Sequence, residues 1–138
     1  MKWVEYSLLS AVLMAAVSLG AKYVLNKGVK VPIILFYAFL SGAIIAAVYV
    51  IYTKQQLRIE PIPLIAIIAI ITVSLLGNYF YFSAINTAPN PGYVSAISAL
   101  QTMIITLAAI ILFKSELTII KGLGITFAVL SAVLLSLK

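Results

Sequence analysis

The sequence predicts an all-α integral membrane protein with five transmembrane helices in a single domain, residues 1–138. Hydrophobic residues make up 64% of the chain and charged residues only 9%, whereas soluble domains average about 45–50% and about 25%. The few polar stretches separate apolar runs of about 20 residues, the length that a bilayer-spanning helix needs. Both observations fit a protein surrounded by lipid.

The first two predicted helices are separated by a short basic loop. The first is expected at residues 6–25, and Lys22 near its end is its only charge. Glu5 and Leu19 do not fit a cleaved signal peptide, so this segment is interpreted as a span. The second helix is expected at residues 32–52, because Pro32 suits a first helical turn, where a missing N–H costs nothing.

The third and fourth helices are expected at residues 62–85 and 91–113. The loop between them is uncharged and rich in Asn and Pro. Asn90 is a typical N-cap and Pro91 a typical first helical residue, so the fourth helix is predicted to begin there.

The fifth helix is expected at residues 117–137. Ser115 is predicted to cap it, and Glu116 to lie favourably at its positive end. Small residues recur at every fourth position of this helix. Such a stripe allows close approach of two helix backbones, so a packing or dimerisation seam is predicted at Gly124, Ala128 and Ala132.

Composition also excludes several classes of function. The chain has no Cys or His, and its only acidic residues are Glu5, Glu60 and Glu116. No His- or Cys-based metal site can therefore form, and we expect no enzyme, metal or cofactor. The net charge is +6, but the basic residues are scattered at helix ends. This favours contact with lipid headgroups over nucleic acid.

Polar side chains form stripes along three of the predicted helices. Lipid does not hydrate such groups, so they face another helix or an aqueous cavity. For the serines, helix–helix contact is the simpler interpretation. For Asn78 and Gln101 both interpretations stay open, and Trp3 is also typical of an interfacial anchor. If the first, third and fourth helices line a cavity, the candidate substrate-binding residues are Asn78, Tyr81, Ser98, Gln101, Thr102, Ser10, Met14 and Trp3.

Lys22 allows two interpretations. Its ammonium could extend to the membrane interface, or it could lie as a cation at the mouth of a substrate path. No carboxylate lies in the middle of any predicted span, which disfavours a central proton-binding acid.

The C-terminal part of the chain resembles a known family. Three segments resemble the second part of an EamA-like domain of the drug/metabolite transporter superfamily. They are YFSAINTA at residues 81–88, LFKSEL at 112–117 and GLGI at 122–125. The LGAKY text at 19–23 is similar as well. A proline near Met103, an arginine near Leu40 and a glycine at Ser115, common in the family, are missing here, so substrate preference is not transferred.

The resemblance implies a transporter. Relatives typically carry two five-helix units, which an odd number of spans places in opposite orientations. This chain is therefore expected to be half of a small-solute transporter that works by alternating access as an antiparallel homodimer in the cell membrane. The alternatives are a flippase for lipids or lipid-linked sugars and a non-transporting accessory subunit of another chain.

Loop charge agrees with a dual orientation. Five helices would place Lys2, Lys54, Arg58, Lys114 and Lys121 on one side, and Lys22, Lys27, Lys30 and Lys138 on the other. Five basic residues against four give almost no bias toward one topology. We therefore expect the chain to insert both ways and to pair with itself.

Overall fold

The computed structural model describes residues 2–136, which contain helices and no strand. Four helical stretches in this range are long and apolar enough to cross a membrane, and a shorter apolar helix follows them. The predicted all-α membrane class is confirmed. The helices are α1 (Lys2–Asn26), α2 (Val31–Tyr52), α3 (Pro61–Thr87), α4 (Pro91–Ser98), α5 (Leu100–Phe113) and α6 (Ile119–Ser136).

The outward surfaces of the helices are apolar. Ile45 of α2 is 70% exposed and Ile70 of α3 is 67% exposed, and many other large aliphatic side chains are similarly uncovered. Water would penalise so much exposed hydrocarbon, whereas lipid does not. The surface of this chain is therefore in contact with the bilayer.

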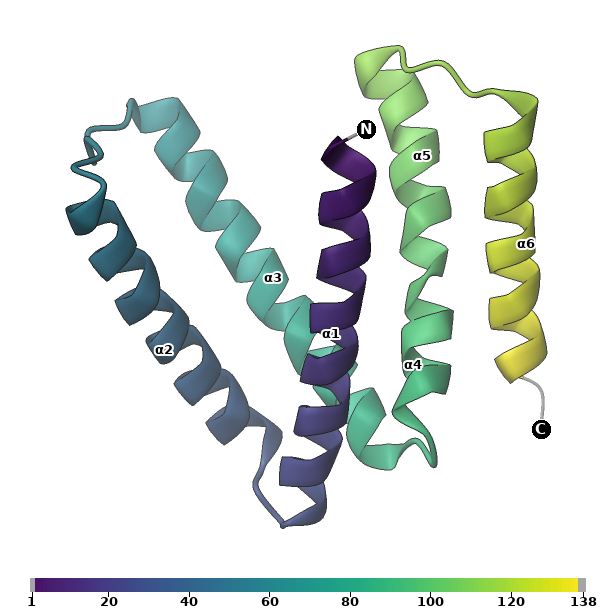
Figure 1. The fold of residues 1–138 in the computed structure, drawn as a ribbon, viewed down its shortest axis with the longest axis horizontal. Coiled ribbons are helices and arrows are strands. Elements are labelled where there is room, and N and C mark those ends of the chain that lie inside the picture. Colours follow the sequence, from purple (N-terminus) through teal and green to yellow (C-terminus); the bar gives the residue numbers. More distant parts are fainter. Residues whose placement is uncertain (1, 137–138) are drawn as a thin grey trace. The chain divides into compact units, whose positions relative to one another are not determined.

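Residues 20–87 form one compact unit, made of the last turns of α1 with α2 and α3. Gly28, with φ +86°, ends α1 in the left-handed conformation, and its N–H donates to the Leu25 carbonyl at 2.9 Å. The chain then enters α2, whose first turn contains Pro32 as predicted. The hairpin of α2 and α3 is antiparallel (Figure 1).

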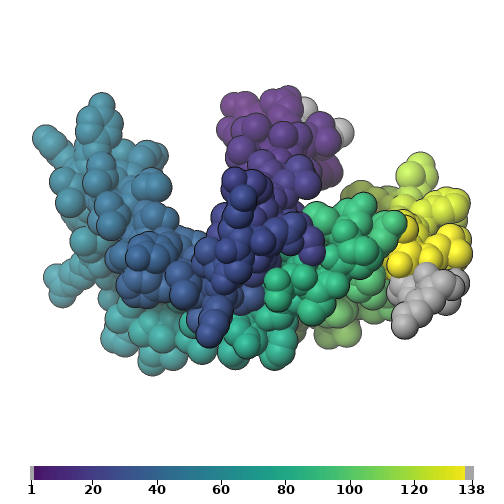
Figure 2. Space-filling view, turned by 90° about the horizontal axis from the view of Figure 1, so that it is seen from below, coloured from purple at the N-terminus to yellow at the C-terminus, as the bar shows by residue number. Residues whose placement is uncertain are grey.

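The core of this unit lies where α1 ends, α2 begins and α3 ends. Ile85 is fully buried there. Figure 2 views this end of the unit, with the last turns of α1 in dark blue and α3 in teal. Away from this end the hairpin side chains are largely exposed. The other buried residues of the unit are Ala21, Leu25, Val31, Leu35 and Phe82.

Residues 2–19 and 88–136 belong to the second compact unit. Its C-terminal part is a helical hairpin in which α6 packs against α4 and α5 (Figure 1). Val94 of α4 and Ala132 of α6 are its buried hydrophobic residues in the described range. The N-cap prediction for α4 is confirmed, because the Asn90 side chain accepts a hydrogen bond from the Gly92 N–H at 2.8 Å and Pro91 follows directly.

The predicted start of the last helix is wrong by two residues. The helix begins at Ile119, so Ser115 and Glu116 lie in the connection before it. Thr118 provides the cap instead, with its hydroxyl accepting from the Lys121 N–H at 3.4 Å. The physical reason lies at the end of α5, where Lys114 takes the left-handed conformation with φ 50°. Residues 114–118 then form the connection between α5 and α6, and Thr118 is the residue with a hydroxyl that directly precedes Ile119.

Candidate functional site

A local irregularity interrupts the helical stretch from Pro91 to Phe113. At Ala99 the backbone tightens, with the Ala99 N–H shared between the carbonyls of Ser95 and Ala96 at 3.1 and 3.2 Å. The Thr102 N–H then donates to the Ala99 carbonyl at 2.9 Å, a bond to the third preceding residue. A short 3₁₀ segment inside a helix often marks a functional position. The sequence gives no Gly or Pro signal for it.

Three predicted site residues flank this irregularity: Ser98, Gln101 and Thr102. Most hydroxyl groups in the helices bond to the carbonyl of the fourth preceding residue, as Ser95 does at 3.2 Å and Thr106 at 2.8 Å. Within residues 2–136, the side chains of these three have no such bond and no other polar partner. Their hydrogen-bonding groups are therefore available to a ligand, to water or to another chain.

The lack of a polar partner matters most for Gln101, because this residue lies deep in the membrane span. It lies near the middle of the 23-residue span Pro91–Phe113, about 15 Å from the first residue and about 18 Å from the last at 1.5 Å rise per residue. Its side chain is exposed in the single chain. An unpaired amide facing hydrocarbon costs several kcal/mol. The surface that carries Gln101 therefore requires a polar neighbour.

Asn78 and Tyr81 lie one turn apart on α3 and are both half-buried. The Asn78 amide donates to the Ser74 carbonyl at 2.8 Å and to the Ser74 hydroxyl at 3.3 Å. Its Nδ2 is thus held by its own helix, while its carbonyl oxygen makes no bond with the described residues. These two residues belong to the unit of residues 20–87, and Ser98, Gln101 and Thr102 to the other. That all five line one cavity stays a prediction.

The candidate residues on α1 are exposed. Trp3 is 66% exposed in the first turn, and Met14 is 52% exposed. Ser10 is exposed as well and makes no hydrogen bond with the described residues. The position of Trp3 at a helix end suits an aromatic anchor at the membrane interface. A role of the three in substrate binding stays a prediction.

Lys22 has a role that the sequence did not reveal. Its ammonium donates to the carbonyls of Ile85 at 3.0 Å and Asn86 at 3.3 Å. Both carbonyls belong to the last turn of α3, where helix carbonyls lack intrahelical partners and carry the negative end of the dipole. Lys22 therefore caps α3 from α1. The two residues lie 63 positions apart, so no local pattern could have indicated the contact.

The three residues of the predicted small-residue seam differ in how deeply they are buried. Ala132 is 1% exposed and Ala128 is half-buried, whereas Gly124 is exposed. A Cβ atom added at Gly124 would meet nothing within 4 Å. The C-terminal part of the seam is thus used inside the chain, and the Gly124 position is open. Its role in dimerisation stays a prediction.

Among the residues that the structure describes, no three His, Cys, Asp or Glu side chains are placed to hold a metal ion. The polar groups that could contact a solute are amides and hydroxyls, which donate and accept hydrogen bonds without carrying charge.

Long apolar helices with an apolar surface and uncharged polar side chains at mid-span define a multi-pass integral membrane protein with polar groups inside the bilayer. The model of the EamA-like transporter family matches residues 1–137, so the chain belongs to that family. It is therefore a membrane transporter of the drug/metabolite superfamily. No curated protein and no solved structure matches the chain significantly.

Proposed function

We propose that this chain is one half of a transporter that carries a small metabolite or amphipathic solute across the membrane by alternating access. The observation that carries the proposal is the group of Ser98, Gln101 and Thr102, whose side chains have no polar partner among the described residues. They lie next to the backbone irregularity at Ala99. Mid-span polar groups beside an interrupted helix are typical of substrate sites in secondary transporters.

The chemistry of these side chains favours an uncharged or zwitterionic solute with several hydrogen-bonding groups. The amide of Gln101 offers both a donor and an acceptor, and the hydroxyls of Ser98 and Thr102 offer the same on a smaller scale. No acidic residue lies between Pro91 and Phe113 to neutralise a cation. We therefore assign binding to hydrogen bonds and not to an ion pair.

The second half of the transporter is proposed to be a second copy in the opposite orientation. A partner would supply the polar neighbour that Gln101 lacks among the described residues. The near-equal loop charge, five basic residues against four for a five-span arrangement, permits insertion in both directions. An antiparallel pair would reproduce the inverted repeat that transporters commonly use.

Uptake by the purified protein tests the transport proposal. Liposomes that contain only this chain are incubated with a mixture of amino acids, sugars, nucleosides and amphipathic amines, and the contents are identified by mass spectrometry. We expect uptake of at least one uncharged or zwitterionic solute. Gln101→Leu should reduce its initial rate by up to about tenfold, as the loss of about one hydrogen bond implies. Ile104→Leu, on an exposed residue of the same helix, should leave it unchanged. No uptake of any compound would favour an accessory subunit.

Orientation is tested with reporters fused to the C-terminus. An enzyme active only in the cytoplasm and one active only outside it should both give signal from the unmodified chain. Two lysines added to the 53–60 connection should suppress one of the two signals, because added charge favours one topology. A one-sided signal from the unmodified chain would contradict the antiparallel homodimer.

A further inference from the structure

An apolar groove lies between α5 and α6 on the surface of their hairpin. Its volume is about 370 Å³, and it is open on one side. Two threonines line it, but their hydroxyls are already used within their own helices. The Thr106 hydroxyl donates to the backbone carbonyl of Thr102, and the Thr126 hydroxyl donates to that of Gly122. The groove therefore offers hydrocarbon and almost no polar groups. The lining residues are Met103, Thr106, Leu107, Leu117, Ile119, Gly122, Leu123, Ile125 and Thr126.

Gly122 leaves open space in the lining of the groove. A Cβ atom added at this glycine would meet nothing within 4 Å, so the missing side chain leaves space and relieves no crowding. α5 and α6 are joined by the connection through Leu117, and Leu117 and Ile119 line the groove beside that connection. The groove thus extends along the hairpin from its connected end into the apolar part of the two helices.

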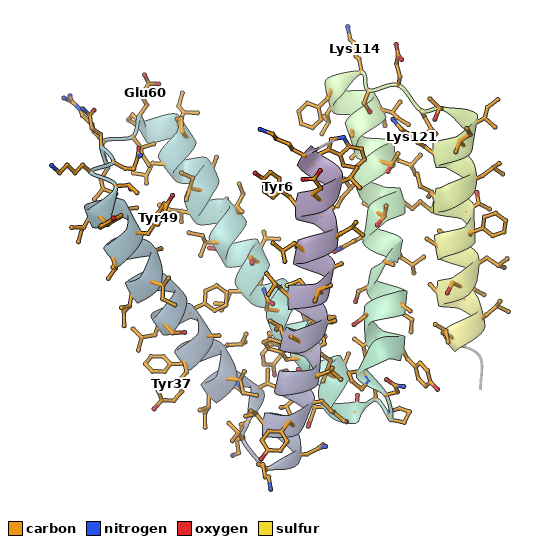
Figure 3. All side chains as sticks on the ribbon, viewed as in Figure 1. Tyr6, Tyr37, Tyr49, Glu60, Lys114 and Lys121 are labelled. Atoms are coloured by element: carbon orange, nitrogen blue, oxygen red, sulfur yellow. The ribbon has the colours of Figure 1, made fainter. Side chains whose placement is uncertain are left out.

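The connected end of the groove carries positive charge. Lys114 ends α5 and Lys121 lies in the first turn of α6, and Figure 3 shows both at the same end of the hairpin. Glu116 lies in the same connection, so two lysines and one glutamate leave a net charge of +1. Within the described residues none of the three forms an ion pair. Both ammonium groups are thus available to an anion at the membrane interface.

An apolar groove on a hairpin whose connected end carries Lys114 and Lys121 is complementary to an anionic phospholipid. The acyl chain matches the hydrocarbon lining, and the phosphate matches the ammonium groups, which attract anionic lipids. A second helix is a poorer occupant. A helix with side chains is about 10–12 Å across, whereas a groove of about 370 Å³ is at the small end of the ligand-sized range of about 300–1,000 Å³.

We propose that this groove is a binding site for an anionic phospholipid, with one acyl chain between α5 and α6 and the headgroup at Lys114 and Lys121. The site lies within one hairpin and is independent of the transport proposal. It holds a bound lipid and takes no part in moving solute.

Native mass spectrometry of the delipidated full chain tests the proposal. The protein is titrated with phosphatidylglycerol or with phosphatidylcholine of identical acyl chains, and the fraction carrying bound lipid is measured. We expect preferential binding of phosphatidylglycerol. Lys114→Gln and Lys121→Gln should each weaken it by about fivefold, the effect of about one basic residue near anionic lipid, and leave phosphatidylcholine unchanged.

The matched control is Lys54→Gln with Arg58→Gln, in the connection between α2 and α3. Lys54 has φ 52° and Lys114 has φ 50°, so both are left-handed lysines at helix ends. The control should leave binding unchanged. Gly122→Leu should fill the groove and reduce binding of both lipids, whereas Gly42→Leu on α2, which also meets nothing within 4 Å, should not.

Two results would overturn the proposal. Equal binding of the two phospholipids by the unmodified chain would show that the lysines do not select a headgroup. If Gly122→Leu altered the oligomeric state and left lipid binding intact, the groove would be occupied by a second copy. Circular dichroism and size-exclusion profiles of each variant show whether it is folded, and a misfolded Gly122→Leu is replaced by Gly122→Val.

Discussion

Polar groups have hydrogen-bond partners in the last turn of α3, whereas in the middle of the Pro91–Phe113 span Gln101 has none among the described residues. At the first, the carbonyls of Ile85 and Asn86 receive hydrogen bonds from Lys22 at 3.0 and 3.3 Å. At the second, Gln101 has no polar partner in the described chain. Polar groups in a membrane protein are normally satisfied. The difference separates a contact that stabilises the fold from a group that we propose binds something outside the chain.

The two regions should consequently respond differently to loss of the polar group. Removal of Lys22 leaves carbonyls without a partner inside a packed unit. Removal of the Gln101 amide takes away an unpaired group and leaves the fold without a defect. A residue that stabilises the fold should change the melting temperature, whereas a residue that contacts solute should change only transport.

The largest expected effect is that of Lys22→Met. The substitution keeps most of the side-chain volume but removes the ammonium that caps α3, so unfolding should become easier by about 2 kcal/mol. The thermal midpoint in detergent measures this. Lys27→Met is the matched control, because Lys27 lies five residues later and its ammonium, 5.6 Å from the centroid of the Tyr23 ring, donates no hydrogen bond to a carbonyl of the described residues. Equal midpoints for the two variants would show that the cap on α3 contributes no stability.

The next effect in size concerns the start of α4. The Asn90 side chain accepts a 2.8 Å bond from the Gly92 N–H, so Asn90→Ala should cost about 1 kcal/mol. The thermal midpoint again measures it. Asn90→Asp, which keeps an oxygen acceptor, should restore most of the stability. If alanine and aspartate had the same effect, the stabilising contribution would not come from the cap.

A smaller effect distinguishes the two hydroxyls before α6. Thr118→Ala removes the acceptor of a long 3.4 Å bond and should cost about 0.5 kcal/mol, the low end for helix caps. Ser115→Ala should have no effect, because Ser115 lies four residues before the first residue of α6. A larger loss of stability in Ser115→Ala than in Thr118→Ala would instead support the helix start at residue 117, capped by Ser115, that the sequence predicted.

The sequence was sufficient for features that depend on local composition. Apolar length predicted the spans, and Asn90-Pro91 predicted both the first residue and the cap of α4, because a cap is formed by residues two positions apart. The contact of Lys22 with α3 could not be predicted, since it depends on how two distant helices pack. The irregularity at Ala99 has no Gly or Pro to indicate it. The start of α6 was missed because Ser115 and Thr118 carry equivalent hydroxyls.

For the candidate site, residue type and depth were predictable and surroundings were not. The sequence showed that Ser98, Gln101 and Thr102 lie close together at mid-span. It did not show that their side chains lack the bond to a preceding carbonyl that Ser95 and Thr106 make. That difference depends on side-chain conformation, because serine and threonine adopt both conformations in helices.

Aqueous labelling of single cysteines near the middle of membrane spans tests the central claim most directly. The chain contains no cysteine, so Gln101→Cys and, on α2, Leu40→Cys each introduce a single thiol near the middle of a membrane span. A membrane-impermeant maleimide is applied to the protein in liposomes, and modification is followed by mass spectrometry. We predict rapid modification at position 101, which we propose faces a water-accessible cavity, and protection at position 40, an exposed apolar position on a helix that is not assigned to the cavity. Protection at both positions would contradict a polar transport site at Gln101.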